Sequence, residues 1–150
     1  MKDTANSSLR ADAEKLSDMF TLLQRGFVLK LSKELVRGNV SFPQYLLLSF
    51  LAQEKDAPTM SEVAAKMQHT TAAATGLVGR LEKLGLARRQ TATKDRRKVF
   101  VHITQKGIEL VTRVREDMVE NLMQLMTHLN ENEQRTWVRI YEKIVPHTPR

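Results

Sequence analysis

The sequence predicts a mainly α-helical fold with one short β-hairpin, for two reasons. Apolar residues recur every three or four positions through most of the 150 residues, as they do in amphipathic helices. Between residues 86 and 103, two short runs with strand character flank the polar segment "TATKDRRK", which is the pattern of a hairpin. A chain of this length allows one domain, or one domain with attached helices.

The first predicted helix covers 16–35, where apolar side chains form one stripe. Gly38 is placed to end it, because glycine commonly follows the last helical turn. Ser41 is suited to cap the second helix, 42–54, and Pro43 fits its first turn, where a missing N–H costs little. This second helix is apolar on most sides, so we expect it at the centre of the core.

Two further helices precede the hairpin. The first is short, covers 62–67, and has Ser61 as its expected cap. The break "QHTT" then leads to a helix over 72–84, for which Thr70 or Thr71 is the expected cap. Apolar side chains form one stripe along this helix and its outer face is small and polar, so we expect one side to be buried.

The hairpin follows Gly85, which stands where a helix ends in a left-handed residue. Strands are expected at 86–90 and 99–103. The turn between them carries "KDRRK", and like charges that face each other across a hairpin repel. The tip is therefore either simply solvated or meets an anionic partner.

The rest of the chain is predicted to be helical. A long helix with a regular apolar stripe covers 105–129. Asn130 and Glu133 have the spacing of a capping box, with asparagine in place of the usual serine or threonine. The final helix carries an apolar stripe that begins at Trp137, and Pro146 stops it.

The order of these elements is that of a winged helix-turn-helix. A helix with a small polar outer face can lie in the major groove of DNA, which is about 12 Å wide. A hairpin beside it can carry cations to the phosphates or to the minor groove. Residues 71–103 hold eight Lys/Arg and two Asp/Glu, so this third of the chain carries almost all of the net charge of +7. Such a patch is typical of a protein that binds nucleic acid, although a merely solvated basic face has the same composition.

Two motifs resemble the MarR family of bacterial transcription regulators. The more specific one is an Asp-x-Arg in the hairpin, then an apolar strand, a threonine and a glycine: Asp95, Arg97, "VFVHI", Thr104 and Gly107. The second, "RLEKLGLARR", also recurs in other winged-helix regulators. The long flanking helices fit the family plan as well, so the resemblance covers essentially the whole chain.

The resemblance implies a single domain over 1–150. Within it, a winged-helix DNA-binding lobe covers 41–104, and dimerisation helices cover 10–38 and 105–146. It implies an obligate homodimer that binds double-stranded DNA at a pseudo-palindromic operator and acts in the cytoplasm as a ligand-responsive repressor. The expected effector is a small hydrophobic or aromatic molecule, and the sequence does not reveal the residues of its pocket.

Eleven residues are expected to contact DNA. The helix over 72–84 offers small side chains to the major groove, and the hairpin offers charged ones to the phosphates and the minor groove. The set is Thr70, Thr71, Ala72, Thr75, Gly76, Arg80, Lys94, Asp95, Arg96, Arg97 and Lys98.

Several of these arginines have two readings. Arg97 matches the family's minor-groove arginine, yet it can also pair with Asp95 inside the tip. Asp95 cannot attract DNA by charge, so its expected role is to orient an arginine, either Arg97 or one on the preceding helix. Arg80 can reach a phosphate or pair with Asp95. Of Arg88 and Arg89, at least one is expected to face solvent or fold onto the helix rather than touch bases.

The outer face of the helix also carries Gly76 and Gly79. Each glycine costs a helix roughly 0.5–1 kcal/mol relative to alanine. They indicate either a close approach of the helix backbone to DNA or tight packing against a neighbouring helix.

No motif for catalysis is present: there is no nucleophile elbow, metalloprotease motif, phosphate loop or dinucleotide fingerprint. The chain has no cysteine, which excludes thiol catalysis and cysteine zinc sites, and its four histidines are not spaced as metal ligands. We therefore expect no enzyme activity, cofactor or metal. No membrane contact is expected either, because "YLLLSFLA" is far shorter than the ~20 residues of a span. Two rival functions stay open: a protein-interaction adaptor, and a small-ligand-binding helical dimer without DNA binding.

Overall fold

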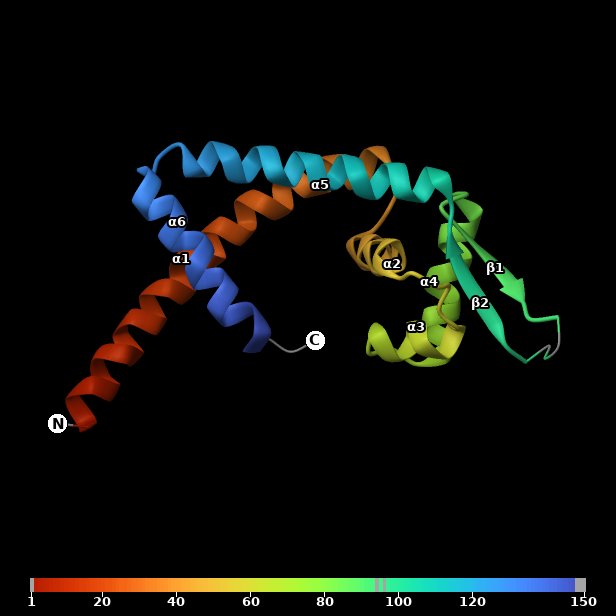
Figure 1. The fold of residues 1–150 in the computed structure, drawn as a ribbon, viewed down its shortest axis with the longest axis horizontal. Helices are drawn as coiled ribbons and strands as arrows, with labels where there is room; N and C mark the ends of the chain where they lie inside the picture. The colour runs from red at the N-terminus through yellow and green to blue at the C-terminus, as the bar shows by residue number, and fades with distance from the viewer. Residues whose placement is uncertain (1, 94, 96, 148–150) are drawn as a thin grey trace. The chain divides into compact units, whose positions relative to one another are not determined.

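The computed structural model describes residues 2–93, 95 and 97–147, with side chains described outside 2–5 and 27–34. The chain forms two compact units, Met1–Arg115 and Glu116–Arg150. The elements, coloured in chain order in Figure 1, are α1 (Lys2–Arg37), α2 (Phe42–Gln53), α3 (Met60–Lys66), α4 (Thr71–Lys83), β1 (Ala87–Thr91), β2 (Val99–Ile103), α5 (Gln105–Met126), α6 (Glu131–Ile144) and the 3-10 turn η1 (Val145–His147).

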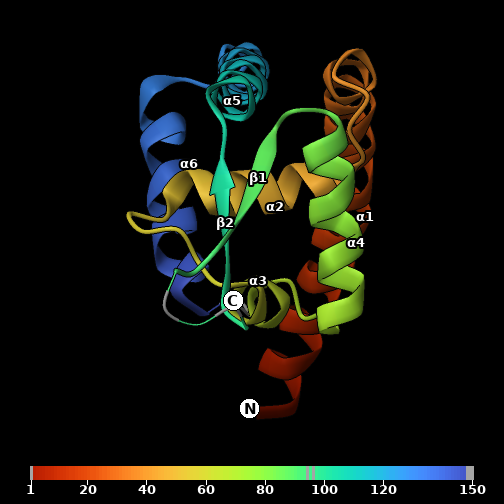
Figure 2. The same cartoon turned by 90° about the vertical axis from the view of Figure 1, so that its right-hand side faces the viewer.

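The predicted fold class, mainly helical with a winged helix-turn-helix, is confirmed. The core of the first unit gathers around α2, whose Leu47 and Leu48 are fully buried. α4 contributes Val78 and Leu81, and β2 contributes Val101. In Figure 2, α2 passes behind the two strands, with α4 along one side and α3 below. The fully buried side chains come from the stripes that periodicity assigned to the inside.

The predicted start of α3 is wrong. The helix begins at Met60, and its cap is Thr59 rather than Ser61. The Thr59 side chain accepts from the backbone N–H of Glu62, and the Glu62 carboxylate accepts from the backbone N–H of Thr59 at 2.6 Å. This reciprocal pair is a capping box, which satisfies donors that a helix start leaves unpaired. Ser61 has no partner of that kind three residues on, since Ala64 follows it.

Both ends of α4 agree with the sequence, whereas α1 and α5 differ from their predicted lengths. Thr70 caps α4 by accepting from the backbone N–H of Ala73, which decides between the two threonines. Gly85 follows α4 with a φ of +71°, the left-handed conformation expected of it. α1 begins well before residue 16, and α5 ends three residues before 129.

The hairpin formed by β1 and β2, with the turn between them, is called the wing. Its strands are antiparallel, and Ala87 pairs with Ile103 at the root while Thr91 pairs with Val99 near the tip. The first strand starts one residue later than predicted. A third segment supports the root: the backbone N–H of Val101 donates to the carbonyl of Pro58 at 2.8 Å, and Thr59 forms an isolated bridge with Phe100. The wing root is thus fastened to the start of α3.

A junction connects the end of α4 to the start of α5. The Thr104 hydroxyl donates to the Gly85 carbonyl at 2.7 Å, and the Lys106 ammonium donates to the Leu84 carbonyl at 2.8 Å. Both carbonyls belong to the end of a helix, where backbone acceptors lack partners within the helix. Gly107 packs so closely on the Leu86 carbonyl and on Ile103 that a Cβ atom has no room there. Thr104 and Gly107 of the hairpin motif therefore hold the start of α5 against the end of α4.

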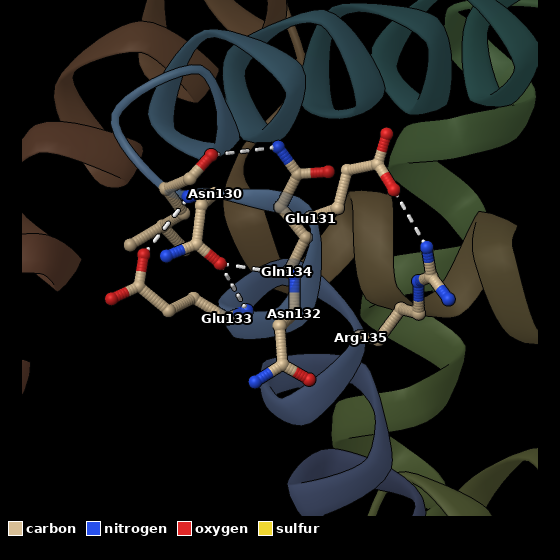
Figure 3. A network of polar contacts seen from close by, with 7 residues as sticks. Asn130, Glu131, Asn132, Glu133, Gln134 and Arg135 are labelled. Carbon is tan, nitrogen blue, oxygen red and sulfur yellow. Dashed lines mark hydrogen bonds and ion pairs between the residues drawn. The ribbon is translucent and has the colours of Figure 1, made fainter.

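In the second unit, α6 starts with the predicted capping box. The Asn130 side chain accepts from the backbone N–H groups of Asn132 and Glu133, and the Glu133 carboxylate accepts from the N–H of Asn130 at 2.9 Å. The Gln134 side-chain amide donates to the carbonyls of Met126 and Leu129. Figure 3 shows Gln134 beside the capping box. α6 ends at Ile144, two residues before Pro146. Among the described residues, no helix combines the length and the apolar character that crossing a membrane requires.

We predict that Gly107→Ala destabilises the protein by roughly 1–3 kcal/mol, because an added methyl must displace the backbone carbonyl of Leu86. Chemical denaturation followed by circular dichroism measures this. The matched control is Gly76→Ala, where a Cβ atom meets nothing within 4 Å and the change should stabilise α4 by roughly 0.5–1 kcal/mol. Equal effects of the two changes would contradict this account of the junction.

Candidate nucleic-acid interface

The outer face of α4 is exposed and small. Thr71, Ala72 and Gly76 are exposed, and Thr75 is half-buried. The Thr75 hydroxyl donates back to the Thr71 carbonyl at 2.7 Å, within the helix. The Thr70 hydroxyl oxygen accepts its capping bond from the backbone N–H of Ala73. The small side chains of this face allow another surface to approach it closely.

The two glycines of α4 are not explained by packing inside the protein. A Cβ atom at Gly76 meets nothing within 4 Å, and one at Gly79 meets only the end of the Arg89 side chain, at 3.9 Å. Of the two explanations for these glycines, tight packing against a neighbouring helix is therefore wrong within the described part of the chain. The remaining prediction is that Gly76 and Gly79 let DNA approach the backbone of α4 closely.

At the tip of the wing, Asp95 orients Arg97. The Asp95 carboxylate accepts from the Arg97 backbone N–H at 3.1 Å and from its Nε at 3.4 Å. The Arg97 side chain is still 94% exposed, so the ion pair leaves it open to solvent. Lys98 is exposed as well. Lys94 and Arg96 lie outside the described residues.

Arg80 is exposed on α4, and the Asp95 carboxylate is engaged with Arg97 instead. Of the two partners considered for Asp95, the structure favours the arginine of the wing. Arg80 keeps its expected role as a phosphate contact, which the structure does not test.

An ion pair between Glu82 and Arg89 joins the wing root to α4, and the sequence had indicated it only in part. The Glu82 carboxylate accepts from the Arg89 backbone N–H at 2.8 Å and from its Nε at 2.6 Å, and the Arg89 Nη2 lies 2.6 Å from Glu82 Oε2. We call this pair the Glu82–Arg89 clamp. The expectation that at least one of the two root arginines folds onto the helix is confirmed by Arg89. Arg88 instead donates to Gln90, on its own strand.

Two carboxylates of this unit have lowered pKa values. Hydrogen bonds from the Thr59 backbone and hydroxyl lower the pKa of Glu62, and the nearby charge of Lys98 adds to the effect. The Arg89 side chain lowers the pKa of Glu82, and the backbone N–H of Arg89 contributes further. Both groups are therefore held in the charged form. On β2, burial lowers the pKa of His102, helped by Arg88, its partner across the wing.

We predict that Glu82→Gln reduces the acid sensitivity of folding. A carboxylate whose pKa lies below the ordinary 4.5 stabilises the folded state above that pH, and this contribution is lost as the pH falls through its lowered value. Because the two side chains of the clamp are 27% and 38% exposed, we expect a loss of roughly 1 kcal/mol at neutral pH, and this difference from the parent protein should shrink as the pH falls through the lowered pKa of Glu82. Urea denaturation at several pH values measures this.

The matched control for that experiment is Glu14→Gln. Glu14 pairs with Arg10 on α1 at 3.0 Å, but both side chains are largely exposed, so the change should alter stability little at any pH. The clamp would be unimportant if the two variants responded to pH in the same way.

The sequence is similar to known transcription regulators. Residues 39–98, which span α2 through the wing tip, match the profile of the MarR family. The chain is 29% identical over 76 residues to the HTH-type transcriptional regulator MgrA of Staphylococcus aureus, and this match covers 51% of each protein. It is 25% identical over 123 residues to the HTH-type transcriptional regulator MhqR of Bacillus subtilis, covering 80% of this chain and 84% of the relative. The chain thus spans about half the length of MgrA.

Solved structures share the fold. The YusO protein of Bacillus subtilis superimposes with a TM-score of 0.74 and 23% identity, over 90% of this chain and 97% of YusO. A complex of S. aureus MepR with DNA superimposes with a TM-score of 0.72 and 23% identity, over 87% of this chain and 98% of MepR. Identities this low show the fold alone. The profile match is thus to the MarR family over residues 39–98, and the solved structures share the winged helix-turn-helix fold over most of this chain.

Proposed function

We propose that the protein is a sequence-specific DNA-binding transcription regulator that acts as a homodimer in the cytoplasm. The observation that carries the proposal is the pairing of two features in one unit. α4 has a small, exposed outer face, and beside it the wing carries an exposed arginine, oriented by a carboxylate, at its tip. MgrA and MhqR are named as HTH-type transcriptional regulators, which supports the same function here.

In this proposal α4 enters the major groove and the wing follows the phosphates to the minor groove. Thr71, Ala72 and Gly76 would face the base edges, where small side chains allow the helix backbone to come close. Arg97 would enter the minor groove, where the negative potential is strongest at narrow A·T-rich steps. The cations at 94, 96 and 98 would neutralise phosphates, which gives affinity without sequence preference. That MepR was solved with DNA supports DNA as the partner of this fold.

The homodimer is proposed from apolar side chains that stay exposed in the chain taken alone. On α1 these include Leu16, Met19, Phe20 and Leu23, and each is at least 45% exposed. α6 adds another group, namely Val138, Ile140, Tyr141 and Ile144. Monomeric proteins rarely leave so many apolar residues uncovered on one helix, and obligate dimer interfaces are apolar. We propose that a second copy of the chain covers these residues, because a two-fold symmetric operator is bound by a two-fold symmetric dimer.

We also propose that a small hydrophobic or aromatic effector releases the protein from DNA, so that it works as a repressor. Without cysteine, a thiol switch is excluded as the signal. An effector must instead bind one conformation of the dimer more tightly than the other, because equal affinity for both shifts nothing. The basic wing would attract anionic compounds.

The experiment that tests this function is selection of bound sequences from random double-stranded DNA, followed by titration of the best one. We expect a pseudo-palindrome with half-sites roughly 10 bp apart, two protomers per site, and affinity that falls steeply with salt. Selection of no sequence, together with binding that is indifferent to salt between about 50 and 200 mM, would favour the adaptor or the ligand-binding dimer instead.

A second prediction concerns the wing tip. Arg97→Ala should weaken operator binding by roughly 1–3 kcal/mol per contact, and most on A·T-rich flanks. Asp95→Ala should also weaken binding, although it removes a repulsive charge, because Arg97 loses the carboxylate that orients it. Electrophoretic mobility shift at fixed salt measures both, and circular dichroism should report unchanged folding. Tighter binding by Asp95→Ala would refute the orienting role.

A further inference from the structure

Arg89 belongs to the wing, but its side chain lies on α4. The guanidinium is the nearest group to the place that a Cβ atom of Gly79 would occupy, at 3.9 Å from Nη2. Gly79 lies one helical turn after the exposed Gly76, so it continues the outer face of α4. That face has no long side chain between residues 71 and 79. Arg89 therefore delivers a charged group to a helix surface whose own residues are small.

The clamp fixes the orientation of this group. Glu82 engages the Nε and Nη2 side of the guanidinium and also the backbone N–H of the same residue. A guanidinium has five N–H donors in a planar fork, so the edge formed by Nη1 and Nη2 stays directed away from the carboxylate. A side chain that is 38% exposed can use this edge toward a partner that approaches α4.

An arginine held in this way suits a base edge better than a phosphate. Phosphate contacts depend on charge, and the carboxylate of Glu82 already neutralises the charge of Arg89. Base recognition depends on geometry, because two donors must meet two acceptors in one plane. Guanine presents such a pair, O6 and N7, in the major groove, and arginine is its commonest partner.

An arginine folded onto the helix was expected not to touch bases, but from this geometry we propose that Arg89 reads a guanine in the major groove from its position over Gly79. Glu82 is the residue that positions it. This inference rests on the proposed function, since it needs α4 to lie in the groove. It adds a long, specificity-determining side chain from the wing to a helix face whose own residues between 71 and 79 are small. Gly79 provides the room that the guanidinium occupies.

The test uses the full-length protein and the operator that it selects from random DNA. The variants are Arg89→Lys, which keeps the charge and loses the fork, and Arg89→Gln. The matched controls are Arg88→Lys and Arg88→Gln, the same changes one residue earlier, where the side chain donates to Gln90 rather than to α4. Affinities are measured for the operator and for versions with each guanine of the half-site replaced. Thermal unfolding of every variant checks its folding.

A second measurement changes the DNA as well as the protein. An operator with 7-deazaguanine at one position lacks the N7 acceptor but keeps its base pairing. We expect this operator to bind the parent protein roughly tenfold more weakly per half-site, and Arg89→Lys to lose roughly as much on the normal operator. Arg89→Lys should no longer distinguish the two operators, whereas the Arg88 variants should distinguish them as the parent protein does.

Three outcomes would overturn the inference. A selected half-site without guanine would do so, as would an Arg89→Lys variant that discriminates normally among bases. A loss of affinity that is equal for all sequences and reduces the salt dependence would assign Arg89 to a phosphate instead. Failure of the parent protein to bind any DNA would defeat the proposed function itself, and that result is distinct from specific binding that ignores Arg89.

Discussion

The junction between the end of α4 and the start of α5 is the constraint on which the positions of α4 and the wing depend. A helix that ends leaves carbonyl groups without partners, and here the side chains of Thr104 and Lys106 supply the missing donors. Because the wing lies between these two points of the chain, its root is held at both ends. The close contact of Gly107 with the Leu86 carbonyl leaves no space for the junction to open. Side-chain donors to backbone carbonyls and the packing of Gly107 thus hold the wing against the end of α4, together with the Glu82–Arg89 clamp.

Three acidic residues of this unit also help to hold the wing and α3 in place. Asp95, Glu82 and Glu62 each engage a cation or a backbone N–H at a defined place: the tip of the wing, its root, and the helix to which the root is fastened. None of them reduces the positive charge of the unit enough to change its sign. Their effect is on direction, since a carboxylate that binds one side of a guanidinium determines where its other donors point.

Much of this fold could be predicted from the sequence, because helix periodicity and capping residues are local signals. The capping box at Asn130 and the left-handed Gly85 were both predicted. The cap of α3 was missed although the signal was present: Glu62 stands three residues after Thr59, whereas Ser61 has no such partner. The choice between Arg88 and Arg89 could not be made, because it depends on the register of the wing, which pairs Arg89 with the buried Val101. The open space around Gly76 could not be predicted, because it depends on which elements pack near that face of α4.

The segment of Pro58 and Thr59 pairs with β2 and divides the hairpin into two parts that tolerate substitution differently. Val101 is fully buried and its N–H is bonded to Pro58, so the root belongs to the core of the unit. Beyond Phe100 no such support reaches the described part of the tip, where Arg97 and Lys98 contact solvent. Substitutions at the tip therefore carry little cost in folding. Over evolution, the residues at the tip can therefore vary while the scaffold that presents them stays the same.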